Sequence, residues 1–325
     1  MTSSPVSSVD SRLESLRLLP EDRSHGWIFP GQGAQSVGMA QDLAGTFKVA
    51  EQVFSEANEA LGFDLAEICF NGPSETLSQT KFTQPALVTH SIAALLAAHD
   101  AGKITVRPAF TAGHSLGEYA SLIVSGSISF ADGIKLVQAR GQLMQDACDV
   151  EVGTMAAILG LDVPAIQELC INNSSNICNI NAPGNVTIGG NEKAVSDSME
   201  AAAQAGAAKV VPLSVAGAFH TPLMQTAADG MVDIVENFVF ADPIIPVVSN
   251  VSADTIVSGE SIAAELLAQI TAPVLWLDGV NHMHSEGVRS LFEFGPGRVL
   301  TGAAKRTHSD FDLNNIGTVE DIEKQ

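Results

Sequence analysis

Positively charged residues are scarce in this sequence. Only 16 Lys and Arg stand against 37 Asp and Glu, which gives a formal net charge of −21 over 325 residues. A field of that sign repels phosphate backbones, so nucleic acid is not expected as a partner. The acidity by itself fits a chain kept soluble by its charge, or one adapted to a salty habitat.

Cysteines and long apolar runs are also lacking. The four cysteines form no Cys-x-x-Cys pair, which excludes a disulfide framework and a zinc site, so no metal is expected. Free thiols fit a reducing interior. No apolar run reaches the roughly 18 residues of a membrane-spanning helix, so no membrane partner is expected either. The cysteines are Cys69, Cys148, Cys170 and Cys178.

The N-terminal residues 1–25 contain neither a clear transit peptide nor a secretory signal. They are rich in serine and mix arginines with acidic residues, whereas a transit peptide is poor in acids and a signal needs an apolar stretch. We expect a flexible or loosely docked leader, or the remnant of a longer parent chain.

The rest of the chain alternates short apolar strands with helices, which predicts a parallel sheet covered on both faces. Residues 151–218 differ, because they follow the order β-α-β-β-α-β of a ferredoxin-like unit. We therefore expect a large α/β subdomain, residues 26–150 and 219–325, with a small inserted subdomain at 151–218. The expected strands of the large subdomain are 27–29, 109–112, 244–249 and 290–294, and its main helices are 84–98, 130–148, 223–239 and 261–269.

One serine is placed where a buried strand should pass directly into a helix. Gly113-x-Ser115-x-Gly117 follows the strand at 109–112, which is the setting of a nucleophile elbow that exposes the serine oxygen. Glycines are needed there because side chains would collide in so tight a turn. The pattern alone arises by chance in a chain rich in glycine, so its position is the stronger argument. A structural serine in a turn is the alternative.

A serine hydroxyl needs a base to take its proton. His220 follows the last strand of the insertion, at the junction of the two subdomains, and is the candidate; a structural histidine is the alternative. His114 should point away from the serine oxygen along the strand. No Asp or Glu between Ser115 and His220 is marked as a third triad member. A pair whose imidazole is held by a backbone carbonyl is equally workable.

Two further features suit a substrate. The loop Pro30-Gly31-Gln32-Gly33 would present backbone N–H groups at the carboxyl edge of the sheet, where α/β proteins bind ligands, although a plain turn is the alternative. Arg140 lies in an apolar helix of a chain short of cations. It either pairs structurally or clamps a substrate carboxylate with its two-pronged guanidinium.

Five motifs in order give a specific resemblance. The chain is similar to malonyl-CoA:acyl carrier protein transacylases and to the acyltransferase domains of polyketide synthases, from about Gly26 to Ile322. This resemblance implies an α/β-hydrolase-like core with a parallel sheet and an inserted ferredoxin-like subdomain. The motifs are Phe29 to Gly33, Thr83 to Leu87, Gly113 to Tyr119, Gln138 to Gln145 and Ala218 to Met224.

The resemblance also implies roles. Ser115 matches the nucleophile and His220 the base, while the backbone N–H of Leu116 and the Gln32 segment match the oxyanion hole. Gln269 matches the residue whose backbone carbonyl orients the histidine. Among the substrate-binding positions, the arginine pairs with the malonyl carboxylate, and the phenylalanine, with the leucine after the serine, resembles a malonyl-selective pattern. Those positions are His114, Arg140, Met144 and Phe219.

The implied reaction moves a malonyl group from malonyl-CoA to the phosphopantetheine thiol of an acyl carrier protein through a malonyl-serine, for fatty acid or polyketide synthesis. The alternatives are an editing hydrolase of carrier thioesters on the same serine and histidine, and a non-catalytic docking protein. No cofactor is expected beyond the substrate's coenzyme A and the carrier's phosphopantetheine. We expect a monomer in the cytoplasm, or in a plastid or mitochondrial matrix of a eukaryote.

Carrier proteins of such pathways are acidic, which conflicts with an enzyme of charge −21. The carrier should therefore dock on some of the few basic side chains. The candidates are Arg289, Arg298, Lys305 and Arg306, or else Lys193 and Lys209.

Overall fold

The computed structural model describes residues 8–325, so the first seven residues of the expected leader lie outside the described residues. For residues 8–25 the expectation of a flexible leader is wrong. They form helix α1 (Val9–Arg17) and the first part of strand β1 (Glu21–Phe29). Val9, Leu13 and Leu16 recur at helical spacing and are buried in the main core, which ties the segment down.

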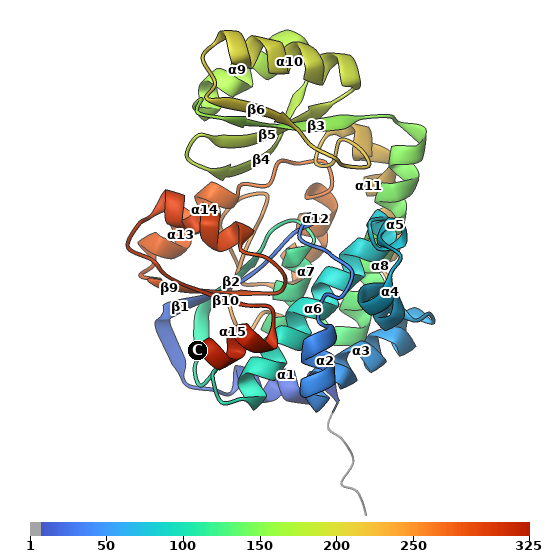
Figure 1. Cartoon of the computed structure of the whole chain (residues 1–325), viewed down its shortest axis with the longest axis vertical. Helices are drawn as coiled ribbons and strands as arrows, with labels where there is room; N and C mark the ends of the chain where they lie inside the picture. Colours follow the sequence, from blue (N-terminus) through green and yellow to red (C-terminus); the bar gives the residue numbers. More distant parts are fainter. Residues whose placement is uncertain (1–7) are drawn as a thin grey trace, which may run out of the picture.

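The large subdomain is built on one six-stranded sheet (Figure 1). Each pair of neighbouring strands is parallel except the last, which is antiparallel. In the central strand β1, Trp27 and Phe29 join one hydrophobic cluster and Ile28 the other, as expected for a strand buried on both faces. The order of the strands is β10 (Asp312–Ile316), β9 (Ser290–Phe294), β1, β2 (Arg107–Gly113), β7 (Val247–Val248) and β8 (Thr255–Ile256).

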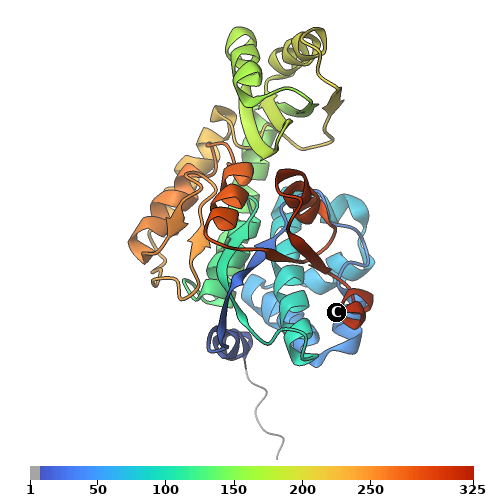
Figure 2. The ribbon, with the colours of Figure 1, turned by 90° about the vertical axis from the view of Figure 1, so that its left-hand side faces the viewer.

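Helices cover both faces of this sheet (Figure 2). One face packs against α13 (Trp276–Ser285) and α14 (Val299–Thr307), and the other against α6 (Thr80–Asp100) and α7 (Gly117–Ser125) with their neighbours. The remaining helices of the large subdomain are α2 (Gln41–Thr46), α3 (Lys48–Leu61), α4 (Leu65–Asn71), α5 (Ser74–Leu77), α8 (Phe130–Val150), η1 (Pro222–Met224), α11 (Gln225–Val235), α12 (Gly259–Ala268) and α15 (Val319–Lys324).

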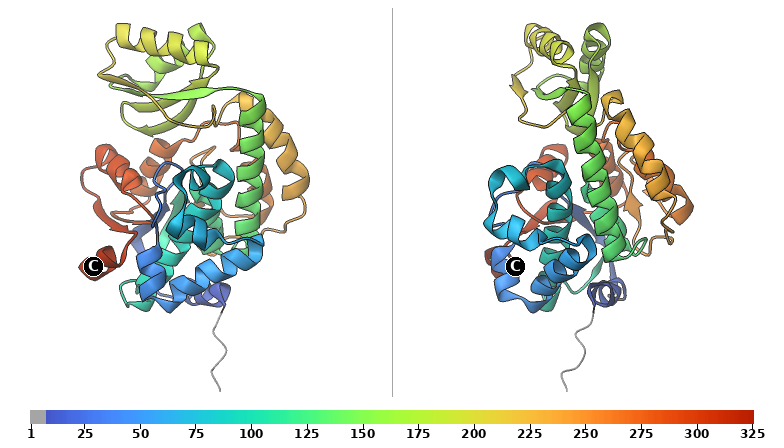
Figure 3. Two further views of the ribbon diagram at one scale, coloured as in Figure 1. Left: turned by 45° about the vertical axis from the view of Figure 1, so that its right-hand side comes forward. Right: turned by 90° about the vertical axis from the view of Figure 1, so that its right-hand side faces the viewer.

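The small subdomain lies within the expected residues 151–218. Its four strands form an antiparallel sheet in the order β4-β5-β3-β6, which is the ferredoxin-like arrangement. Figure 3 shows α8 running along the large subdomain and leading into the small one. The prediction of a parallel α/β core with a separate antiparallel unit is therefore confirmed. The elements of that unit are β3 (Thr154–Leu159), α9 (Val163–Asn173), β4 (Asn176–Ala182), β5 (Asn185–Gly190), α10 (Glu192–Gln204) and β6 (Lys209–Pro212).

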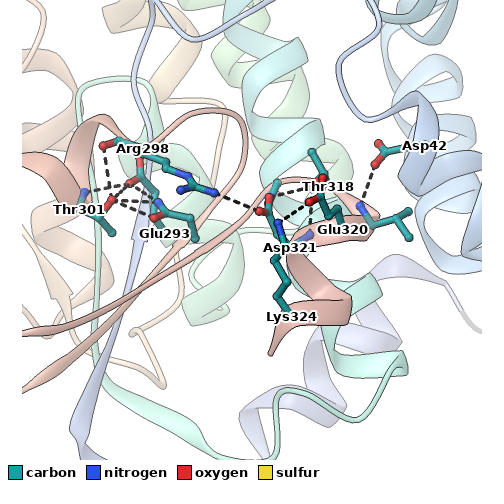
Figure 4. A network of polar contacts seen from close by, with 11 residues as sticks. Asp42, Glu293, Arg298, Thr301, Thr318, Glu320, Asp321 and Lys324 are labelled. Carbon is teal, nitrogen blue, oxygen red and sulfur yellow. Dashed lines mark hydrogen bonds and ion pairs between the residues drawn. The ribbon is translucent and has the colours of Figure 1, made fainter.

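Helix α14 is held by a buried carboxylate (Figure 4). Glu293, at the end of β9, accepts hydrogen bonds from the backbone N–H groups of Leu300 and Thr301, from the Thr301 hydroxyl and from the Asn315 amide, at 2.9–3.2 Å. Burial raises the pKa of this carboxyl, and the hydrogen bonds oppose the rise. The first N–H groups of a helix lack partners within the helix, so the carboxylate fixes where α14 begins.

None of the helices within residues 8–325 is long and apolar enough to cross a membrane. The four cysteines are buried and unpaired.

Candidate active site

The turn that the sequence predicted between β2 and α7 is present, with Ser115 at φ +53°. A Cβ on Gly113 would lie 1.9 Å from the carbonyl carbon of Gly117, and a Cβ on Gly117 would lie 2.3 Å from the carbonyl oxygen of Phe29. Only glycine therefore fits on either side of the serine. Strain of this kind at a single serine is typical of a functional turn.

Asn250 holds this turn in place. Its Oδ1 accepts the backbone N–H of Ser115 at 2.7 Å, and its Nδ2 donates to the carbonyl of Gly113 at 2.7 Å. Sequence reasoning missed Asn250. The available signal was an asparagine directly after the strand expected at 244–249, and therefore at the same sheet edge as Ser115.

Ser115 and His220 form a hydrogen-bonded pair. The Oγ of Ser115 lies 2.8 Å from Nε2 of His220, and Nδ1 of His220 lies 2.7 Å from the backbone carbonyl of Gln269. A carbonyl only accepts, so Nδ1 is the protonated nitrogen and Nε2 is free to take the serine proton. No carboxylate is needed to fix this tautomer.

His220 is uncharged at neutral pH. Burial lowers its pKa to about 3, with the positive charge of Arg140 as the second cause. Both effects disfavour the imidazolium, so the free-base form persists well below the ordinary histidine range. The group is thus available as a proton acceptor across the whole physiological range.

This shift predicts an unusual pH profile. Between about pH 5.5 and about pH 8, kcat/KM should show no acid-side fall with a midpoint near the ordinary histidine value of about 6.5, because His220 keeps its proton-free form there. A malonyl thioester of pantetheine is the suitable substrate, since it carries no phosphate that titrates in this range. A fall centred between about pH 6 and pH 7 would show that the base is an ordinary histidine.

Arg140 lies beside the same hydroxyl. Its Nη2 is 3.1 Å from Ser115 Oγ and 2.8 Å from the side-chain oxygen of Gln269, and its Nη1 is 2.8 Å from the side-chain oxygen of Gln84. The side chain is only 1% exposed, and burial lowers its pKa. Within residues 8–325 the guanidinium has no hydrogen-bonded carboxylate partner, and its Nε has no partner at all. A buried cation among neutral groups favours an anionic ligand.

The two residues expected in an oxyanion hole have free donors. Among the described residues, neither the backbone N–H of Gln32 nor that of Leu116 has a hydrogen-bond acceptor. Both residues line the same cavity as Ser115. Two free N–H groups beside a nucleophile suit a negative charge that develops on a carbonyl oxygen.

A cavity of about 360 Å³ joins these groups between the two subdomains. Its floor is the carboxyl edge of the large sheet, and its other wall includes Asn179 and Asn181 of β4. His114 lines it, with Nε2 3.0 Å from Asn181 Oδ1, so this side chain points away from the serine and toward the small subdomain. Met144 and Phe219 also line it. The structure therefore brings all the predicted side chains together, with only the side chain of Gln269 behind the cavity wall.

Outside this cavity, one group of side chains within residues 8–325 has the composition of a metal site. His284, His308 and Asp310 offer ligand atoms within 4.8 Å of one another. The two imidazole rings are stacked, however, at 3.7 Å and 6°. A metal lies in the plane of each imidazole that binds it, and two parallel planes do not meet, so the rings as placed do not share an ion. Asp310 also pairs with Arg289.

The family described as acyl transferase domain matches residues 26–324. Among curated proteins, the malonyl CoA-acyl carrier protein transacylase of Staphylococcus aureus (strain MSSA476) is 39% identical over 300 residues, which is 91% of this chain and 96% of that protein. The protein of the same name from Escherichia coli (strain K12) is 42% identical over 284 residues, covering 86% and 91%.

Solved structures agree with this similarity. The acyl carrier protein S-malonyltransferase of Vibrio cholerae superposes with a TM-score of 0.89 at 39% identity, covering 93% of this chain and 99% of that one. A malonyl-transacylase solved in complex with a type II PKS acyl-carrier protein gives the same TM-score and identity, covering 93% and 98%.

Proposed function

The chain belongs to the acyl transferase family of malonyl-CoA–acyl carrier protein transacylases, and from this premise we propose a two-step exchange in which Ser115 carries the malonyl group. The overall reaction moves a malonyl group from malonyl-CoA to an acyl carrier protein. The observation that supports the proposed route most directly is the convergence of a base and a buried cation on one hydroxyl. Ser115 Oγ lies 2.8 Å from the His220 imidazole and 3.1 Å from the Arg140 guanidinium.

The first step loads the enzyme. Ser115 Oγ attacks the thioester carbonyl while its proton passes to Nε2 of His220, and the N–H groups of Gln32 and Leu116 bind the oxyanion. The C–S bond then breaks, and the proton passes from His220 to the departing sulfur of coenzyme A. A malonyl ester remains on Ser115, with its carboxylate on Arg140.

The second step transfers the malonyl group from Ser115 to the carrier. The phosphopantetheine thiol of the carrier gives its proton to His220 and attacks the ester carbonyl. The bond to Ser115 Oγ breaks, and the oxygen recovers the proton from His220. One thioester replaces another and protons balance at each step, so the proposed exchange needs no cofactor or metal.

The hydrolase alternative differs only in what attacks the ester. Every relative and structure reported above bears the name of a transacylase or malonyltransferase, and none supports a hydrolase. Holding the malonyl carboxylate on Arg140 also gives the enzyme a way to keep the ester away from an activated water. An assay that follows malonyl release with and without the holo carrier separates the two reactions.

The carrier should dock beside Arg306. Of the six basic candidates, Arg289, Arg298 and Lys193 are held in ion pairs, whereas Arg306 is exposed, lines the cavity and has no ion pair within residues 8–325. It belongs to α14, which also lines the cavity with Leu300. We propose that it meets an acidic side chain of the carrier.

Reversing this charge should weaken the carrier specifically. Arg306→Glu should raise the KM for the holo carrier by about tenfold. Increasing salt should bring the KM values of the variant and the unmodified enzyme closer together, because salt screens the charges. Lys193→Glu is the matched control, since it makes the same charge change at an exposed side chain of helix α10, outside the cavity. An unchanged carrier KM in Arg306→Glu would remove this residue from the docking face.

We further propose that the enzyme acts as a monomer in the cytoplasm, with no nucleic acid or membrane partner. Buried free thiols fit a reducing compartment, and the residues that make the site come from one chain. Size-exclusion chromatography with light scattering, carried out at assay concentrations, tests the oligomeric state.

A further inference from the structure

The side chain of Gln269 stands between the buried guanidinium of Arg140 and the buried carboxyl group of Glu118. Its oxygen accepts from Arg140 Nη2 at 2.8 Å, while its Nε2 donates to the carbonyl of Ser115 at 3.0 Å and to a carboxylate oxygen of Glu118. Gln269 and Glu118 are both fully buried. The backbone carbonyl of Gln269 also holds His220, so one residue contacts the nucleophile, the base and the cation.

An amide can be turned either way, and its neighbours decide which way it lies. Arg140 only donates, so it needs the oxygen of Gln269. The carboxylate of Glu118 and the carbonyl of Ser115 accept, so they need the NH₂ group. A half-turn of the amide would place its NH₂ group against the donor of Arg140 and its oxygen against the acceptors of Glu118 and Ser115, so all three hydrogen bonds would be lost.

We propose that Glu118 is a positioning residue for substrate choice: its carboxylate fixes the orientation of the Gln269 amide, which keeps a hydrogen-bond acceptor on Arg140 and aims the guanidinium at the acyl carboxylate. This inference rests on the proposed role of Arg140.

The environment of Glu118 supports a role beyond packing. Its two oxygens accept the backbone N–H of Asn250 at 3.1 Å and the NH₂ of Gln269. Burial raises its pKa well above the ordinary value, with the nearby charge of Glu265 as the second cause, and a hydrogen bond with the Glu265 side chain raises it further. A carboxyl in such a place is costly to bury, and an apolar residue would pack there more cheaply. The N–H of Asn250 and the NH₂ of Gln269 both need an acceptor, which explains why a carboxyl group occupies position 118.

The isosteric change Glu118→Gln tests this geometry. The N–H of Asn250 belongs to the backbone and cannot turn, so the oxygen of the new amide must face it. The new NH₂ group then faces Gln269 and opposes its NH₂, which favours the half-turn and leaves a donor against Arg140. The ratio of kcat/KM for malonyl-CoA to that for acetyl-CoA should fall by about 10–100-fold, the effect of losing one hydrogen bond to a charged group.

Glu293→Gln is the matched control. It makes the same change on another fully buried carboxyl, which accepts the N–H groups of Leu300 and Thr301 and contacts neither Gln269 nor Glu118. Its ratio should stay within about twofold of the unmodified enzyme. If a folded Glu118→Gln variant also keeps the malonyl-to-acetyl ratio of the unmodified enzyme, the proposal is overturned. If Glu118→Gln does not fold, Glu118→Asp withdraws the acceptor by one methylene, and an unchanged ratio there overturns it equally.

A double-mutant cycle with Gln269→Met shows whether the effect passes through Gln269. In that background, Glu118→Gln should change the malonyl-to-acetyl ratio by less than about twofold, whereas fully additive losses would contradict the proposal. Arg140→Ala separates this inference from the function it rests on. If Arg140→Ala leaves the ratio intact, the clamp itself fails. If only Glu118→Gln leaves it intact, the clamp stands and the positioning role fails.

Discussion

Ser115→Ala should lower kcat/KM for malonyl transfer by at least about 10⁴-fold. In the two-step route every turnover passes through an ester on Ser115 Oγ, and within residues 8–325 no other hydroxyl hydrogen-bonds to Nε2 of His220. What remains is the contribution of binding and of the N–H donors of Gln32 and Leu116. The loss is measured as the initial rate of malonyl-carrier formation with saturating holo carrier.

Ser121→Ala is the matched control for this change. Ser121 lies in the same helix α7, is buried, and its hydroxyl has no hydrogen-bond partner among the described residues. Removing that oxygen should leave the rate within about twofold and the thermal stability nearly unchanged. Retained transfer activity in Ser115→Ala, against this control, would contradict the assignment of the nucleophile.

Arg140→Ala should abolish the preference for malonyl over acetyl. The ratio of the two kcat/KM values should fall by about 10⁴-fold, because a site built around a buried charged donor rejects a substrate that leaves the donor unpaired by about 10⁴–10⁵. Within residues 8–325 the hydrogen bonds of Arg140 go only to neutral oxygens, so the malonyl carboxylate supplies the counter-charge and an acetyl group does not. Competition between the two thioesters in one reaction measures the ratio directly.

A second effect of Arg140 adds to this preference. Its charge is the second cause, after burial, of the low pKa of His220. A malonyl carboxylate offsets that charge and makes the imidazole a stronger base when the correct substrate is bound. An acetyl group carries no charge to offset that of Arg140, so His220 remains the weaker base when acetyl-CoA is bound. Arg140→Lys keeps the charge but loses the two-pronged geometry, so it should retain part of the preference. A ratio unchanged in Arg140→Ala would show that another group selects the acyl chain.

Much of the fold could be predicted, because buried strands and helices leave a periodic pattern in the sequence. The elements that the sequence did not predict include an edge strand and two helices. Strand β10 (Asp312–Ile316) is polar at most positions, so its sequence lacks the apolar run of a central strand. Helix α1 was missed because its charged residues hid apolar positions at helical spacing. Helix α13 was not expected and follows the short loop after Gln269.

The candidate site was predictable where a side chain acts at a recognisable turn or motif. Ser115, His220 and Arg140 are of this kind. Asn250 and Glu118 act through contacts with chain segments more than 130 residues away in sequence, as the separations of their hydrogen bonds show. Such contacts depend on how β2 and β7 pair in the sheet, and local pattern does not specify that pairing.

The covalent intermediate is the central claim, and intact-protein mass spectrometry tests it most directly. The enzyme mixed with malonyl-CoA alone should gain the mass of one malonyl group, and holo carrier protein should remove that mass and appear as malonyl-carrier. Ser115→Ala should gain nothing under the same conditions. A malonyl adduct that persists in Ser115→Ala, or transfer by the unmodified enzyme with no adduct at any time, would contradict the account.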